Sequence, residues 1–561
     1  MNTPDSAPAT PLADSVLRPD RVFPTLTNEQ IARIAPHGRR REITAGDVLV
    51  EIGDKAVPFF VVLSGEIEAL RPSDKGDTLL VRHRAGQFSG EANMISGQRS
   101  IARLRVTVSG EALELTRERL LALIQTDAEL SEILMRAFML RRLELIARDM
   151  GDVVVIGSAH SAGTLRVKEF LTRNGHPYQY IDLDRDRASQ DLLDQFQVTV
   201  ADIPVVIGCG QAALRNPTNS QIADSLGFNE DIEQDRVSDL VIVGGGPAGL
   251  AAAVYGASEG LDVLVLESDV PGGQAGSSSR IENYLGFPTG ISGLDLTGRA
   301  YAQALKFGAH LVVAKPATGL TCDGQRYTVE IDAGTRVSAR AVIIATGAEY
   351  RKPDLENLSA FEGSGVYYGA TPMEAQLCVG EEVVVVGGGN SAGQAAVFLS
   401  ATARRVHMLV RGEGLAESMS RYLIRRIEDN PAIVLRTHTQ VVALEGKQQL
   451  ERIHIQDATG AIESHDIRHV FMMTGAVPNT RWLSNCVALD EKGFVKTGPD
   501  LSTEELARAK WPLARPPFLL ETTRPGVFAV GDIRSGNVKR VASAVGEGSI
   551  AVAFVHQVLR Q

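Results

Sequence analysis

The sequence predicts a multidomain α/β protein, and three observations support that prediction. At 561 residues, the chain is long enough for three or more domains of ordinary size. Two Gly-rich segments, 239–267 and 381–411, each have the pattern of strand, tight turn, helix and strand. Before them, residues 42–68 alternate apolar stretches with turn signals, which is typical of a small β-barrel or jelly roll. We therefore expect a β-rich N-terminal part followed by repeated α/β units.

The segment Asp239–Glu267 is the most informative part of the chain. An apolar strand leads directly into the pattern G-x-G-x-x-G, formed by Gly244, Gly246 and Gly249. Such glycines permit a tight turn, close approach of a pyrophosphate and close helix packing, while the helix N-terminus faces the phosphates. Glu267 ends the second strand, where an acid holds a ribose hydroxyl. The segment predicts a dinucleotide site; the alternative is a Gly-rich turn in an ordinary α/β domain.

The segment Glu381–Arg411 repeats this pattern. Gly387, Gly389 and Ala392 form G-x-G-x-x-A after a second apolar strand. Two dinucleotide units in one chain indicate a flavoprotein, in which one Rossmann-like domain holds FAD and the other holds a nicotinamide.

Four further residues of the second unit are candidates for nicotinamide binding. Asn390 and Ser391 lie at the turn, where they are expected to cap the helix and contact the pyrophosphate. Arg411 ends the second strand, where a positive charge favours a 2′-phosphate, and Arg421 can supplement it. The sequence therefore favours NADPH, with NADH as the alternative.

Composition excludes several classes of function. Apolar residues make up 44% of the chain and charged residues 22%, as in globular proteins, and the formal net charge of −11 argues against a nucleic-acid partner. There is no run of about 18 apolar residues, so no membrane span is expected. The N-terminus lacks the basic and apolar regions of a signal peptide, and residues 1–19 are expected to be a disordered tail.

The four cysteines, Cys209, Cys322, Cys378 and Cys486, are spread along the chain. None lies within ten residues of another, which excludes a C-x-x-C motif and a Cys-rich zinc site, so no metal is predicted. This usage fits a reducing cytoplasm, and a cytoplasmic location is expected.

Residues 20–147 carry short motifs between the expected strands, and a helical region, 116–148, follows them. The motifs are Ala45-Gly46-Asp47, Leu63-Ser64-Gly65-Glu66, Gly90-Glu91 and Arg99-Ser100. This part resembles a cyclic-nucleotide-binding domain, in which the glutamate of a Gly-Glu pair holds the ribose hydroxyl and a later arginine pairs with the cyclic phosphate. The resemblance implies a cyclic nucleotide bound by Gly90, Glu91, Arg99 and Ser100. The interval from Glu91 to Arg99 is one residue shorter than in the commonest form, and the alternative is a barrel kept as a docking module.

Residues 150–228 begin with strand, helix and strand, where a DNA-binding relative would continue into a helix-turn-helix. A helix around Gln190–Phe196, a strand after Ile203-Pro204 and Cys209 follow. The pattern resembles a glutaredoxin or thioredoxin-like fold, with Ile203-Pro204 where that fold places a cis-proline. The family's C-x-x-C is replaced by residues 158–161, Ser-Ala-His-Ser, so we interpret the module as a redox-inactive adaptor or docking surface. The acidic residues 228–237 are interpreted as a linker.

From Ser238 to the C-terminus, a series of motifs follows in a characteristic order. They are GGGPAG, Gly272-Gly273-Gln274, Ile281-Glu282-Asn283-Tyr284, Ala345-Thr346-Gly347, Thr474-Gly475, Pro478-Asn479-Thr480, Gly531-Asp532 and Lys539-Arg540-Val541. This part resembles the low-molecular-weight thioredoxin reductases. The resemblance implies an FAD domain, 237–353 with 480–561, interrupted by an NAD(P) domain, 354–479. The implied FAD contacts are Gly244, Gly246, Pro247, Ala248, Gly249, Glu267, Gly273, Gln274, Asn283, Ala345, Thr346, Gly347, Gly531, Asp532, Lys539, Arg540 and Val541.

One part of the reductase pattern is absent. Gly369 and Pro372 stand where that family has the two cysteines of its redox disulfide. A disulfide is required to pass electrons from reduced flavin to a thioredoxin by exchange. The nearest thiol is Cys378, for which a functional role and a buried helix cysteine are the two alternatives.

The sequence thus predicts an FAD-dependent NAD(P)H oxidoreductase in which hydride passes from nicotinamide to flavin. Lys539 or Arg540 is expected to stabilise charge on the reduced flavin, and the NAD(P) domain is expected to rotate, as in related reductases. A homodimer is expected, and the barrel is a candidate regulatory domain. The acceptor is left open among a protein thiol, a quinone, an iron–sulfur protein and O₂. Two alternatives are a thioredoxin-disulfide reductase with a non-standard thiol route, and a redox or cyclic-nucleotide sensor with little turnover.

Overall fold

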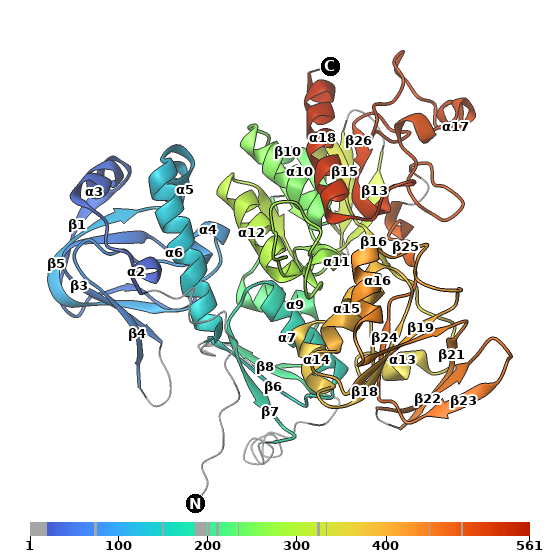
Figure 1. Ribbon diagram of the computed structural model, residues 1–561. Coiled ribbons are helices and arrows are strands. Elements are labelled where there is room, and N and C mark those ends of the chain that lie inside the picture. Colours follow the sequence, from blue (N-terminus) through green and yellow to red (C-terminus); the bar gives the residue numbers. More distant parts are fainter. Residues whose placement is uncertain are drawn as a thin grey trace, which may run out of the picture.

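The computed structural model describes residues 19–560, except 56, 72–75, 148–150, 186–198, 200–201, 209–212, 234, 323–325, 333, 448 and 484–485. The expected helix around Gln190–Phe196, Cys209 and residues 1–18 of the expected tail therefore lie outside the described residues. Residue 19 already begins helix α2 (Pro19–Val22). Figure 1 shows the β-rich N-terminal part on one side of the molecule and the second Gly-rich unit on the other.

The N-terminal part is an antiparallel sheet in the order β1-β5-β3-β4, with β2 paired to β5. Its two central strands are 13 residues long, and they bend where their register shifts near Gly65, whose φ is +83°. Helices α2 and α3 precede β1, α4 lies between β4 and β5, and α5 and α6 follow β5. The elements are α3 (Asn28–Ile34), β1 (Arg39–Ile43), β2 (Val48–Val50), β3 (Phe59–Arg71), β4 (Thr78–His83), α4 (Asn93–Ser96), β5 (Arg103–Leu115), α5 (Arg117–Thr126) and α6 (Ala128–Ala147).

The second part, called here the module, is a four-stranded sheet in the order β7-β6-β8-β9. Strands β6 and β7 are parallel and the other pairs antiparallel, which is the topology expected for a thioredoxin-like fold. The Ile203-Pro204 bond is cis, as predicted. The elements are β6 (Val153–Gly157), α7 (Ala162–Arg173), β7 (Tyr178–Asp182), β8 (Val205–Gly208), β9 (Leu214–Arg215) and α9 (Asn219–Leu226).

The first Gly-rich unit lies in a sheet of order β12-β11-β10-β15-β14-β13, with β26 paired to β15. Strands β10, β11, β12, β15 and β26 pair in parallel, and β10 is almost wholly buried. The elements are β10 (Val237–Val243), α10 (Pro247–Ser258), β11 (Val263–Leu266), α11 (Gly273–Gly276), α12 (Gly293–Lys306), β12 (His310–Val312), β13 (Ala317–Thr321), β14 (Tyr327–Ile331), β15 (Thr335–Ile344), β26 (Val527–Ala529) and α18 (Val541–Leu559).

The second Gly-rich unit has its own parallel sheet, in the order β17-β24-β18-β19-β20, and a smaller antiparallel sheet, β21-β22-β23. The chain crosses between the two units twice, where β16 pairs with β25. The elements are β16 (Ala348–Tyr350), β17 (Val366–Tyr367), α14 (Pro372–Leu377), β18 (Glu382–Val386), α15 (Asn390–Leu399), β19 (Arg405–Val410), α16 (Arg421–Glu428), β20 (Ile433–Thr437), β21 (Gln440–Gly446), β22 (Leu450–Gln456), β23 (Ile462–His465), β24 (His469–Met472) and β25 (Ala476–Pro478).

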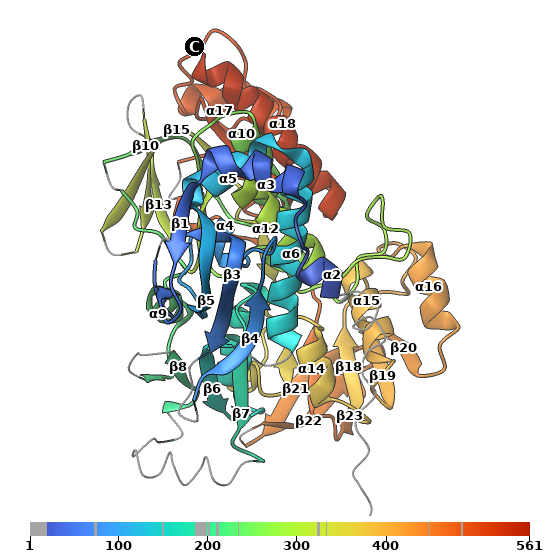
Figure 2. The same ribbon diagram turned by 90° about the vertical axis from the view of Figure 1, so that its left-hand side faces the viewer.

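The four parts share buried surfaces. Helices α4 and α5 of the N-terminal part contact α12, and one hydrophobic core runs from Phe59 and Phe138 to Ile242 and Val265. Both ribbon views place the N-terminal part beside α12 (Figures 1 and 2). The module lies below α12 and next to α14 (Figures 1 and 2). The arrangement is therefore that of one packed body.

Helix α18 is, within the described residues, the one helix long and apolar enough to cross a membrane by length and composition alone. In this fold one face of α18 packs along α10, and its buried residues are Ala544, Gly548, Ala551, Val552 and Val555. Its Gly548 is so close that an added Cβ would lie 2.2 Å from the carbonyl oxygen of Ala248.

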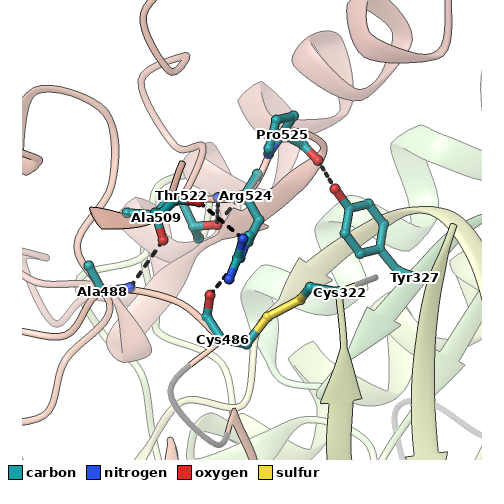
Figure 3. Close-up of a disulfide and its surroundings, with 9 residues drawn as sticks. Cys322, Tyr327, Cys486, Ala488, Ala509, Thr522, Arg524 and Pro525 are labelled. Carbon is teal, nitrogen blue, oxygen red and sulfur yellow. Dashed lines mark hydrogen bonds between the residues drawn. A yellow bond between two sulfur atoms is a disulfide. The ribbon is translucent and has the colours of Figure 1, made fainter. Parts of the chain in front are cut away.

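Cys322 and Cys486, separated by 164 residues, form a disulfide whose Cα atoms are 6.7 Å apart (Figure 3). The bond joins the end of β13 to the segment after β25. The spacing of the cysteines along the chain does not report a contact between residues so far apart. The prediction that the cysteine usage fits a reducing cytoplasm is therefore wrong for Cys322 and Cys486, because disulfides are rare in that compartment.

Candidate nucleotide-binding sites

A cavity of about 610 Å³ lies at the carboxyl ends of β10 and β15. Its wall contains most of the residues that the sequence assigns to FAD. These are Gly244, Gly246, Pro247, Ala248, Glu267, Gly273, Gln274, Ala345, Thr346, Gly347, Gly531, Asp532, Lys539, Arg540 and Val541.

The three glycines of the first unit have three different environments. Gly244 has φ +110°, and a Cβ there would lie 2.3 Å from the carbonyl oxygen of Ala345. A Cβ on Gly249 would lie 1.9 Å from the carbonyl oxygen of Gly244, so Gly249 acts in packing and is not on the wall. Gly246 is the N-cap of α10, and the nearest atom to its Cβ position is 3.9 Å away. Gly244 and Gly249 therefore close the turn, and Gly246 leaves room for a ligand at the helix N-terminus.

Glu267 lies at the cavity wall although it is only 6% exposed. Its carboxylate accepts hydrogen bonds from the backbone N–H groups of Gly245 (2.6 Å) and Asp269 (2.9 Å). Burial raises the pKa of this carboxyl, and the two backbone hydrogen bonds oppose that rise. The carboxylate is thus held in a defined orientation, as a ribose-binding acid requires.

Asp532, Lys539 and Arg540 lie at the wall near the N-terminus of α18. Burial raises the pKa of Asp532, and the charge of Lys539 opposes that shift. Burial lowers the pKa of Lys539, while Asp532 opposes that shift in turn. The Lys539 ammonium lies 4.8 Å from the ring centroid of Phe494. These are the charged groups that the sequence places beside the flavin.

Asn283 does not lie on the cavity wall and is exposed. Its neighbour Glu282 turns toward the second unit, where Oε2 accepts from Nη1 of Arg426 at 2.5 Å. The contact predicted between Asn283 and the flavin is therefore absent from this wall, because the loop that carries Asn283 bridges the two units.

The turn of the second unit reaches the same cavity through Ser391, whereas Gly387, Gly389 and Asn390 are not on its wall. Gly387 has φ +140°, and Gly389 is the N-cap of α15 without a side-chain cap. Asn390 does not cap the helix as predicted, because its Oδ1 accepts from the backbone N–H of Ser420 at 2.8 Å. Ser391, at the start of α15, lies on the wall of the cavity described above. Ala392, which follows it, is buried.

Arg411 and Arg421 are both exposed. Within the described residues, neither forms an ion pair. Their charges are thus available to an anionic ligand, as the sequence predicts for a 2′-phosphate.

The segment that replaces the redox disulfide forms a helix start. Thr371 caps α14 in a reciprocal arrangement with Glu374, and Ala370 is buried. Cys378 is 0% exposed, and its thiol donates to the carbonyl oxygen of Glu374 at 2.9 Å. Burial raises the pKa of this thiol to about 12. Cys378 therefore matches the buried helix cysteine and not a reactive thiolate.

The N-terminal part contains a smaller pocket of about 110 Å³, lined by Gly90, Glu91 and Ser100 but not by Arg99. The Arg99 side chain points toward the module, and its Nε would lie 2.6 Å from a Cβ on Gly227. The residues on either side of Arg99, Gln98 and Ser100, both line the pocket. The prediction that Arg99 pairs with a cyclic phosphate is wrong for this structure.

Other wall residues were missed by the sequence analysis. Tyr350, Trp482 and Ser277 lie on the wall of the large cavity, and so does Arg173 of the module. No motif marks Arg173, because its position depends on how the module packs.

Comparison with known proteins gives consistent results. A family model described as pyridine nucleotide-disulphide oxidoreductase matches residues 238–548, and one described as cyclic nucleotide-binding domain matches residues 40–127. The thioredoxin reductase of Bacillus subtilis is 31% identical over 59% of this chain and 97% of its own. That of Treponema pallidum is 33% identical over 56% of this chain and 94% of its own. The crystal structure of T. acidophilum thioredoxin reductase aligns with 58% of this chain and 100% of its own, with TM-score 0.52 and 28% identity.

Proposed function

The chain belongs to the thioredoxin reductase-like pyridine nucleotide-disulphide oxidoreductases, and from this premise we propose that it passes electrons from NADPH through FAD to an acceptor outside the chain. The family match confirms the resemblance predicted for residues 238–561, and the second match confirms the cyclic-nucleotide-binding resemblance of the N-terminal part. The members of this family use FAD and NADPH.

The observation that supports the proposal best is the convergence of both Gly-rich units on one cavity. Gly246 at the N-terminus of α10 and Ser391 at the N-terminus of α15 lie on the same wall. The N-terminus of a helix offers backbone N–H groups to phosphates, so we propose that a nicotinamide nucleotide held at α15 binds next to a flavin nucleotide held at α10. Bound FAD supplies the hydride-accepting chemistry.

The protein contributes binding, orientation and charge. Glu267 is oriented to hold a ribose hydroxyl by its two backbone hydrogen bonds. Lys539 and Arg540 add positive charge at the wall, where negative charge on a reduced flavin needs stabilisation. Arg411 and Arg421 favour NADPH because their exposed guanidinium groups suit a 2′-phosphate.

The acceptor is proposed to react with the flavin directly. Residues 369–372 contain no thiol, and the Cys378 thiol is buried and protonated. Thiol–disulfide exchange requires an accessible thiolate, so this segment cannot relay electrons to a thioredoxin. An oxidised protein thiol (a disulfide), a quinone, an iron–sulfur protein and O₂ stay as candidate acceptors.

Regulation through the N-terminal part is supported by one chain of contacts. Glu230, between the module and β10, pairs with Arg117 of α5 at 2.8 Å and with His310 of β12 at 3.4 Å. A change in the N-terminal part can therefore reach the FAD domain through Glu230. The homodimer and the cytoplasmic location, the latter expected from the cysteine usage, remain predictions.

Anaerobic stopped-flow mixing of FAD-loaded protein with NADPH tests the proposal. Rapid loss of the oxidised flavin absorbance is expected, followed by reoxidation when each acceptor class is added. Absence of bleaching with NADPH and with NADH would exclude the oxidoreductase and favour the sensor. Turnover with a thioredoxin that persists in Cys378→Ser would require a thiol route other than this segment.

A further inference from the structure

The module contributes one residue to the wall of the large cavity. Among its described residues, Arg173, at the end of α7, is the one on that wall. The other lining residues come from the two Gly-rich units. A domain that carries no redox thiols thus reaches the predicted FAD site.

The guanidinium of Arg173 is held in place by two partners. Nη1 donates to Oε1 of Glu169 at 3.1 Å, and Nη2 donates to the carbonyl oxygen of Gly273 at 2.5 Å. The side chain is 12% exposed, and its Nε is buried without a hydrogen-bond partner. A buried donor without a partner costs free energy, which suggests that this group has a further partner when the site is filled.

The position of Arg173 relative to the Gly-rich turn identifies the ligand chemistry. Arg173 binds the backbone of Gly273, and a Cβ on Gly273 would lie 3.1 Å from Cα of Gly246. Gly246 is the helix N-cap where a pyrophosphate is expected. Arg173 therefore adds a full positive charge beside the partial charge of the helix terminus.

The charges of the cavity wall show why another cation is needed there. Its acidic residues are Glu267, Asp269, Glu349 and Asp532, and its basic residues are Arg173, Lys539 and Arg540. Four acids thus face three bases, and a diphosphate adds further negative charge. Without Arg173, both remaining cations would lie near α18, and none would lie beside Gly273.

The module is fixed to the cavity wall and not merely adjacent to it. Val270, Val313 and Ala314 of the FAD domain pack into the core of the module with Val155 and Phe170. Two polar contacts add to this core: Asn219 Nδ2 donates to Asp269 Oδ1 at 2.5 Å, and Asn229 Nδ2 donates to the carbonyl oxygen of Val313 at 2.9 Å. Arg173 is therefore held at a constant position relative to the Gly-rich turn.

We infer that the module, which lacks the C-x-x-C of the thioredoxin-like family, is part of the FAD site, and that Arg173 is a positioning and binding residue for the anionic diphosphate of the cofactor. This inference rests on the proposed function, because it takes FAD as the occupant of the large cavity. It assigns to the module a role in cofactor retention that needs no thiol.

The experiment measures FAD affinity and not turnover. The dissociation constant of FAD is obtained by fluorescence titration of the apoprotein of the full chain, for the wild type, Arg173→Ala, Arg173→Lys and Arg166→Ala. Arg166 is the matched control: it lies on the same helix, binds Asn219 and Pro217 within the module, and is not on the wall. Circular dichroism checks that each variant is folded.

We expect Arg173→Ala to weaken FAD binding by about 10- to 100-fold, the usual effect of removing a hydrogen bond to a charged group. Arg173→Lys should keep part of the affinity, and Arg166→Ala should stay within about twofold of the wild type. Added NaCl should weaken binding to the wild type more than binding to Arg173→Ala, because salt screens the charge that the variant lacks.

Equal losses in Arg173→Ala and Arg166→Ala would overturn the inference, since packing of the module and not the charge would then be responsible. Unchanged affinity in Arg173→Ala would overturn it as well. A wild-type apoprotein that does not bind FAD would instead overturn the proposed function, so the two failures can be distinguished.

Discussion

Glu282 of the FAD domain and Arg426 of the NAD(P) domain form an ion pair in which Oε2 lies 2.5 Å from Nη1. The module joins the same two domains from another side: Leu165 packs into the hydrophobic core of the NAD(P) domain, and Ser364 donates to the carbonyl oxygen of His160 at 3.2 Å. Ser391 lies on the cavity wall in this arrangement. We therefore expect hydride transfer to proceed without the rotation that the resemblance to related reductases implies.

The first prediction is that locking the two domains leaves flavin reduction intact. In the double variant Glu282→Cys and Arg426→Cys, a short bismaleimide should link the domains in the orientation seen here. We expect the rate of flavin bleaching by NADPH to stay within about threefold of the unlinked double variant, because the hydride step needs no rotation. Each single cysteine variant treated with the same reagent is the control. Loss of bleaching in the linked protein alone would show that rotation is required.

The second prediction concerns Arg99, whose side chain points away from the N-terminal pocket. Arg99→Ala should leave the affinity for cyclic AMP or cyclic GMP unchanged, within about twofold, because a side chain outside the pocket does not pair with the phosphate. Calorimetric titration of the full chain measures this affinity. Glu91→Ala is the matched comparison, since Glu91 lines the pocket. A tenfold or larger loss of cyclic-nucleotide affinity in Arg99→Ala would show that Arg99 pairs with the cyclic phosphate after all.

The Gly-rich turn of the first unit and the Arg99 side chain show what the sequence could and could not predict. The roles of Gly244, Gly246 and Gly249 were predictable because they depend on local backbone geometry within one turn. The strand–helix–strand segments likewise follow from local patterns, and the cis bond at Ile203-Pro204 was expected from the resemblance to a thioredoxin-like fold. The direction of the Arg99 side chain depends on a single residue of spacing, which a motif match does not resolve.

Other features were beyond the sequence because they arise from contacts between distant segments. The disulfide joins Cys322 to Cys486, and Ser391 reaches the cavity only through the packing of two domains. Asn283 matches a family motif, yet its loop is held by Glu282 toward the NAD(P) domain. Tertiary packing, and not local propensity, decides each of these positions.

The third prediction follows from His83, which is buried in the N-terminal part beside Arg141. Burial, together with the charge of Arg141, lowers the pKa of this imidazole to about 3. The unfolded state therefore binds a proton from about pH 6.5 downward while the folded state does not, so His83 makes stability fall as pH falls from 6.5 toward 3. The slope should approach about 1.4 kcal/mol per pH unit below the unfolded pKa.

Urea unfolding of the wild type and of His83→Gln between neutral pH and pH 5 measures this effect. Glutamine does not titrate, so the variant should lose less stability than the wild type over the same interval. Parallel pH profiles for the wild type and His83→Gln would contradict a neutral buried His83.

The fourth prediction is that Cys378 takes no part in electron transfer. Its thiol is buried, donates to the Glu374 carbonyl oxygen and has a pKa raised to about 12, so it is protonated at neutral pH. Cys378→Ser should leave NADPH-dependent reduction of artificial acceptors unchanged, and native protein should resist alkylation at Cys378, as peptide mass analysis would show. Alkylation should become rapid once urea exposes the thiol. Rapid modification of the folded protein, together with loss of acceptor reduction in Cys378→Ser, would place this thiol on the electron route. In that case electrons would pass from the flavin to the acceptor through Cys378 at the end of α14, and not directly from the flavin.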